Sequence, residues 1–95
     1  MVNAIIMNEK DTVATVTKNI SSDEDVTFVL NGKTYKIKSK TSIPIYHKVA
    51  IKNMKKGEEV IKYGERIGYA TKNINIGEHV HTHNIDSKRE ENSNE

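Results

Sequence analysis

The sequence predicts an all-β fold, and three observations support this prediction. The chain has 95 residues and contains 12 Ile, 8 Val and 8 Thr, but 1 Leu and 4 Ala. Branching at Cβ restricts χ1 in a helix but packs well on a pleated sheet, so this composition favours strands. Residues 12–17 have the alternating pattern of a half-buried strand. Asn31-Gly32 separates two strand-like runs and predicts a hairpin, because both residues tolerate the positive φ of a type I′ turn.

The expected strands are short. Residues 4–7 are predicted to form the first, and the hairpin runs from residue 26 to 30 and from residue 33 to 38. Pro44 lacks an N–H and restricts Ile43 to extended geometry, so we place this proline in a loop or at the start of a strand.

A short internal repeat follows the proline. Residues 52–60 and 72–80 align at an offset of 20, with Lys, Asn, Gly, Glu and Val identical. We interpret the repeat as one supersecondary unit used twice. Gly57 and Gly77 are expected to occupy equivalent turns with a positive φ, and a strand is expected to begin at the valine that follows.

The chain length allows one small domain, because 95 residues cannot bury two independent cores. We expect this domain over residues 1–85 and a mobile polar tail over residues 86–95. The absence of cysteine excludes disulfides and thiolate metal sites. No apolar run is long enough to cross a bilayer and no export signal is recognisable, so we expect a cytoplasmic protein with no membrane partner.

Positive charge is concentrated in the middle of the chain. Residues 31–72 carry eleven Lys and Arg against three acidic residues, whereas each flanking segment is net negative. Such a segment attracts nucleic acid, anionic lipid or a small carboxylate. Ten of its eleven cations are lysine and aromatic residues do not alternate with them, so we predict no nucleic-acid partner. A merely solvated lysine-rich face is the alternative.

Three of the four histidines lie close together near the end of the domain. In a strand, His79, His81 and His83 would share one face, with neighbours about 6.6 Å apart. One metal ion can then be bound by two successive histidines but hardly by all three. Imidazole suits iron, manganese or zinc, and the other ligands must come from another segment or chain. A polar strand that happens to be rich in histidine is the alternative.

His47-Lys48 is a second candidate, since an imidazole beside a cation can bind or protonate a carboxylate. An ordinary surface histidine is the alternative. No glycine-rich phosphate loop and no nucleophilic triad is recognisable in the sequence.

The motifs together resemble a known family. They are Pro44-x-x-His47-Lys48, Lys62-Tyr63-Gly64, Ile67-Gly68 and Val80-His81-Thr82-His83-Asn84. At these spacings the chain resembles the small SAF domain of the altronate and galactarate dehydratase family, closely over residues 43–84. The resemblance implies a β-clip fold over residues 1–85, a dependence on divalent iron or manganese, and elimination of water from a sugar acid.

The resemblance also implies a division of labour between two parts of an enzyme. Fused family members continue into a large catalytic domain, so this chain resembles a small subunit whose partner is a large catalytic dehydratase subunit. We expect His81 and His83 to serve as catalytic residues and metal ligands in the shared site. His47, Lys48 and Asn84 are expected to contact the substrate, a sugar acid or another hydroxy acid.

Two other functions stay open at the level of sequence. The related sulfolactate sulfo-lyases eliminate sulfite from a sulfonated hydroxy acid and have a similar small subunit. Other SAF-like domains are non-catalytic binding modules. The sequence does not fix the oligomeric state, and a homo-oligomer is compatible with it.

Overall fold

The computed structural model describes residues 1–88 of the chain, and this part contains strands and no helix. The strands are β1 (Ala4–Ile5), β2 (Val13–Val16), β3 (Asp25–Leu30), β4 (Lys33–Lys38), β5 (Lys48–Ala50), β6 (Glu59–Lys62), β7 (Glu65–Ala70), β8 (His79–Val80) and β9 (Ile85–Asp86). The predicted all-β fold is therefore confirmed. The first strand is shorter than predicted, because β1 spans two residues where residues 4–7 were expected.

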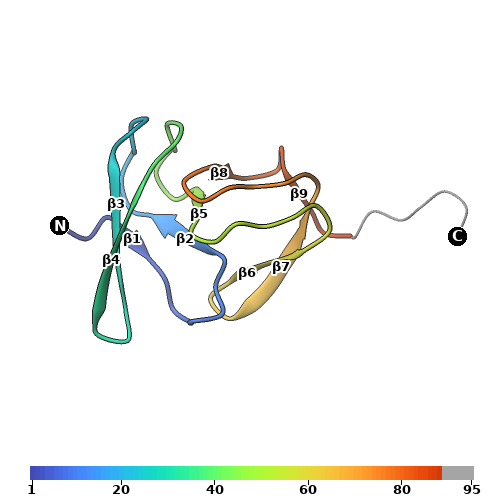
Figure 1. Cartoon of the computed structure of the whole chain (residues 1–95), viewed down its shortest axis with the longest axis horizontal. Helices are drawn as coiled ribbons and strands as arrows, with labels where there is room; N and C mark the ends of the chain where they lie inside the picture. The colour runs from blue at the N-terminus through green and yellow to red at the C-terminus, as the bar shows by residue number, and fades with distance from the viewer. Residues whose placement is uncertain (89–95) are drawn as a thin grey trace, which may run out of the picture.

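The strands form three antiparallel sheets. A central sheet has the order β1-β2-β5-β8, the β3-β4 hairpin forms a second sheet, and β6-β7-β9 forms the third. The two hairpins lie at opposite ends of the domain with the central sheet between them (Figure 1). This arrangement places β5 and β8 side by side in the middle of the molecule.

The central sheet contributes to two hydrophobic clusters. One hydrophobic cluster includes Val16 and Val49, and a second includes Val13 and Val80. Strand β2 contributes to both clusters because successive side chains of a strand point to opposite faces. The expectation of a half-buried strand over residues 12–17 was wrong, since every residue of β2 is buried.

The predicted hairpin is confirmed. Asn31 and Gly32 have φ values of 54° and 77°, as a type I′ turn requires, and Leu30 pairs with Lys33 across the turn. Phe28 of β3 stacks on Tyr35 of β4 with ring centroids 5.5 Å apart, which fixes the register of the pair.

The internal repeat occurs four times rather than twice. Its copies are unit 1 (residues 18–26), unit 2 (residues 41–49), unit 3 (residues 52–60) and unit 4 (residues 72–80). Each unit has a buried apolar third residue and a buried ninth residue, which is always valine. The third residues form bridges that join unit 1 to unit 2 and unit 3 to unit 4.

All four units turn in the same way. The sixth residue has a positive φ, and the N–H of the seventh donates to the carbonyl oxygen of the fourth. The four sixth residues are Asp23 (68°), Tyr46 (69°), Gly57 (90°) and Gly77 (92°). The four bonds are 2.9 to 3.0 Å long. The expected positive φ of Gly57 and Gly77 is confirmed, and their valines are the second residues of β6 and β8.

Two further expectations concern the loop and the tail. Pro44 lies in the turn of unit 2, as predicted. Asp86 belongs to β9 and pairs with Tyr69 of β7, so the predicted tail begins inside a strand. Residues 89–95 of that tail lie outside the described residues. Over residues 1–88, no helix could span a membrane.

The two repeat glycines allow a matched test of the turn. We expect Gly57→Ala to lower the free energy of unfolding by about 1 kcal/mol, because its Cβ would enter open space and only the positive φ is unfavourable. Gly77→Ala should cost about 3 kcal/mol, since its Cβ would also clash with the carbonyl oxygen of Lys38. Urea denaturation measures both values. Equal losses would contradict this reading of the turn.

Candidate functional site

Three histidines at the ends of two adjacent strands form a cluster. His47 immediately precedes β5, His79 begins β8, and His81 immediately follows β8. Strands β5 and β8 pair antiparallel, and His79 lies opposite Val49. His47 comes two residues before Val49 in the sequence. One ring nitrogen from each of the three histidines lies within 4.8 Å of the others. We call these three residues the histidine cluster.

The rings of the histidine cluster are in direct contact. His47 Nδ1 and His79 Nε2 are 2.9 Å apart and share a hydrogen bond. The rings of His47 and His81 stack with centroids 4.0 Å apart and an interplanar angle of 18°. All three side chains are half-buried. The arrangement leaves the Nδ1 atom of His81 buried without a hydrogen-bond partner among the described residues.

A tight turn explains why the histidines do not line a single strand. The predicted strand through His83 was wrong, because β8 ends at Val80. Asn84 is 4% exposed, and its Oδ1 accepts from the backbone N–H of His81 while its Nδ2 donates to the carbonyl oxygen of His79. Both ends of the Asn84 amide therefore hold the turn. Its expected contact with substrate stays a prediction.

His83 lies beside the histidine cluster but is not part of it. Its side chain is exposed, and its ring is tilted by 41° to that of His79 with centroids 5.0 Å apart. Sequence reasoning paired His83 with His81 and gave His79 a lesser role. The structure instead groups His79 with His81 and His47. The roles predicted for His81 and His83 as ligands and catalytic residues stay predictions.

A departure from the repeat brings His47 into the cluster. In units 1, 3 and 4 the seventh residue is glutamate, and its carboxylate accepts the backbone N–H of the fourth residue. In unit 2 the fourth residue is Pro44, which has no N–H, and the seventh is His47. The turn of unit 2 therefore closes through its backbone alone, and the His47 side chain is available to the site. The presence of Pro44 and His47 at the fourth and seventh positions of unit 2 is the sequence feature that could have identified His47 as a site residue.

Two imidazoles of the histidine cluster, those of His79 and His81, have lowered pKa values. Burial lowers the pKa of His79 from 6.5 to about 4, and His83, His47, His81 and Lys48 add to the effect. Burial also lowers the pKa of His81, with His47, Lys48 and His83 contributing. At neutral pH both rings therefore present lone pairs, which a proton or a metal ion can occupy.

Lys48 follows His47 directly and adds positive charge to the region. Its side chain is half-buried, and this burial together with the charge of Lys62 lowers its pKa. The charge of Lys48 acts on both His79 and His81. The expected contact of Lys48 with substrate stays a prediction. An anion bound at this position would relieve the repulsion between the two lysines.

The histidine cluster fits a divalent transition metal. It offers three imidazoles, and the His81 Nδ1 atom has no hydrogen-bond partner over residues 1–88. The expectation that imidazole suits manganese as well as iron and zinc was too broad, because manganese prefers carboxylate and water ligands. The group contains no carboxylate. Any further ligands must therefore come from outside this group.

A small all-β domain built from repeated turns, with a histidine cluster between two of them, defines the class of this protein. Comparison with known sequences identifies its family. The profile of the altronate/galactarate dehydratase SAF domain matches residues 2–88. The chain belongs to this SAF domain family.

Individual relatives carry two different names. The chain is 49% identical over 59 residues to the (2R)-sulfolactate sulfo-lyase subunit alpha of Paracoccus pantotrophus, which covers 62% of this chain and 88% of that subunit. Identity to the subunit of the same name from Chromohalobacter salexigens is 46% over 57 residues, covering 60% of this chain and 61% of the relative. The altronate dehydratase of Bacillus subtilis is 33% identical over 84 residues, which covers 88% of this chain but 16% of that enzyme.

The lowered pKa of His79 makes a specific prediction about pH. Because the unfolded chain binds a proton at this residue near pH 6.5 and the folded chain does so only near pH 4, the stabilisation is complete above about pH 6.5. It should be lost progressively as the pH falls from about 6.5 to about 4. The measurement is the free energy of unfolding across that range in the parent chain and in His79→Gln. The variant should show a flatter profile. Parallel profiles would show that His79 titrates normally.

Proposed function

We propose that this chain is the small, non-autonomous part of a metal-dependent lyase, and that a larger subunit or domain completes its active site. The reaction is elimination of a substituent from the β-carbon of a hydroxy acid, with water leaving from a sugar acid such as altronate or galactarate. The single observation that carries the proposal is the histidine cluster, in which His47, His79 and His81 come together without a carboxylate.

The proposed division of roles follows the positions of the four histidines. His47, His79 and His81 would hold the metal ion, and their donor set favours iron over manganese. When bound, such an ion stabilises negative charge on the substrate carboxylate and its enediolate form. His83 is exposed beside His79 and would contact the substrate, where its imidazole can transfer a proton.

The chemistry requires more groups than the histidine cluster provides. A base must remove the proton α to the carboxylate, and an acid must assist the leaving group. Lys48 supplies a nearby positive charge, but the metal-binding group found in residues 1–88 contains only imidazoles. The relatives support a divided enzyme, because one of them is named as a subunit and matches this chain over 88% of its length.

The same relative favours a second candidate reaction. A (2R)-sulfolactate sulfo-lyase is named for cleavage of sulfolactate, and two subunits with that name are more than 45% identical to this chain where they align. In this alternative the leaving group is sulfite instead of water. A non-catalytic SAF binding module is the remaining reading, and the histidine cluster argues against it.

Reconstitution with a large subunit tests the proposal. We expect no turnover of altronate, galactarate or (2R)-sulfolactate by the purified chain alone, and turnover when a large subunit and Fe²⁺ are added. Replacing His47, His79 or His81 with Ala should weaken Fe²⁺ binding to the chain by on the order of 100-fold, because each removes one of three ligands. Anaerobic calorimetry measures the binding, and sulfite release distinguishes the two reactions.

His83→Ala is the matched control for metal binding. It should leave the Fe²⁺ affinity within about twofold of the parent chain, since His83 lies outside the cluster. It should still lower turnover of the assembled enzyme. Robust turnover by the isolated chain would contradict the proposed small-subunit role. Unchanged Fe²⁺ affinity in all three cluster variants would contradict the metal site.

A further inference from the structure

A polar cavity of about 350 Å³ adjoins the histidine cluster through a shared wall, His79. Part of its lining comes from equivalent places in the repeat: Thr41 and Ser42 begin unit 2, and Lys72 and Asn73 begin unit 4. Every side chain that lines this cavity is polar. Units 2 and 4, with the turn that follows unit 4, therefore build both the histidine cluster and the cavity beside it.

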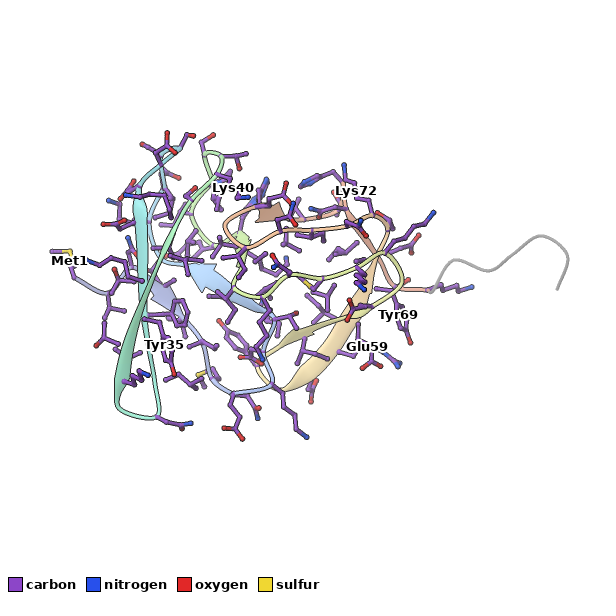
Figure 2. All side chains as sticks on the ribbon, viewed as in Figure 1. Met1, Tyr35, Lys40, Glu59, Tyr69 and Lys72 are labelled. Carbon is purple, nitrogen blue, oxygen red and sulfur yellow. The ribbon has the colours of Figure 1, made fainter. Side chains whose placement is uncertain are left out.

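The lysine at the first position of the unit has a different environment at this cavity than in the other units. Three units begin with lysine. In unit 1, Lys18 forms an ion pair with Glu24 at 2.7 Å, and in unit 3, Lys52 donates to the carbonyl oxygen of Glu9 at 2.9 Å. Among the described residues, Lys72 of unit 4 has no recorded partner, and it lines the cavity. Figure 2 shows Lys72 on the edge of the molecule that also carries β8 and Lys40.

The second residue of unit 2, which also lines the cavity, departs from the repeat. In units 1, 3 and 4 it is asparagine, whose side-chain oxygen accepts a backbone N–H from the neighbouring unit. Unit 2 has Ser42 instead, and its hydroxyl makes no recorded side-chain bond within residues 1–88. The amide nitrogen of Asn73 is also left available, because only its oxygen is engaged.

These groups are mostly hydrogen-bond donors. Lys72 provides an ammonium, Ser42 a hydroxyl and Asn73 an amide N–H₂, all on the walls of one cavity. The one acidic wall residue is Glu78, and its Oε1 accepts the backbone N–H of Asn75 to close the turn. An anion with several oxygen atoms matches this set of donors, because charged acceptors make the stronger hydrogen bonds.

We propose that this cavity is an anion subsite that binds a carboxylate or sulfonate at one end of the substrate, while the other end reaches the histidine cluster. The inference rests on the proposed function and makes it more specific. A substrate that fills both places carries two anionic groups. Galactarate and sulfolactate have two such groups, whereas altronate has one.

Ligand titration of the intact chain tests this subsite without turnover. The probes are galactarate, (2R)-sulfolactate, altronate and the uncharged polyol galactitol, each added to the ¹⁵N-labelled chain and followed by NMR. We expect saturable shifts of the Ser42 and Asn73 amides with both dianions, weaker binding of altronate, and no response to galactitol. Lys72→Gln should weaken binding of the dianions about tenfold, because it removes a charged donor.

Lys52→Gln is the matched control, since it removes the same charge from the equivalent position of unit 3. It should change the affinity less than twofold. Equal weakening by the two variants would overturn the subsite and indicate general electrostatic attraction. Equal shifts with galactitol, or shifts centred away from the cavity, would also overturn it. Dianion binding that depends on Lys72, without turnover by any assembled enzyme, would leave the subsite standing and contradict the proposed function alone.

Discussion

Closure of the repeated turn is the constraint on which the rest of the structure depends. Each unit reverses the chain at a residue with a positive φ and buries its third and ninth side chains. Three units add a second bond, in which the glutamate at the seventh position accepts the N–H of the fourth residue. A proline at the fourth position removes that donor, and Pro44 thereby releases the seventh residue of unit 2 from its structural role.

The candidate site lies where the repeat departs from its own pattern. Units 1, 3 and 4 retain the asparagine and glutamate that bind within the fold, and the lysines of units 1 and 3 also bind within it. Unit 2 replaces all three, and its His47 meets His79 of unit 4 across the β5-β8 pair. Buried valines hold both strands beneath the rings. The turns of units 1 and 3 therefore serve the fold, whereas the turns of units 2 and 4 also contribute residues to the candidate site.

Much of the architecture could be predicted from sequence, because its signals are local. Asn31-Gly32 specifies its hairpin through backbone conformation alone, and Gly57 and Gly77 identify two of the four units. Units 1 and 2 escaped detection because Asp23 and Tyr46 take the same positive φ without being glycine. Non-glycine residues seldom adopt this conformation, so a sequence pattern gives no warning of it.

The composition of the site was harder to predict, because it depends on contacts between distant segments. His81 and His47 were recognised as candidates, but pairing His81 with His83 assumed a strand that continues past Val80. The side chain of Asn84 ends that strand by bonding to both neighbouring backbone segments. The importance of His79 follows from the register of β5 with β8, and no local pattern encodes that register.

Restoring the repeat in unit 2 tests the central claim most directly. The double variant Pro44→Ser with His47→Glu gives unit 2 the fourth and seventh residues of unit 1. The quantity to measure is its free energy of unfolding in urea. We predict a value within about 1 kcal/mol of the parent chain, because the new hydrogen bond offsets the loss of the rigid proline. A loss of about 3 kcal/mol would show that His47 is needed for the fold, and would contradict the account in which Pro44 frees it for function.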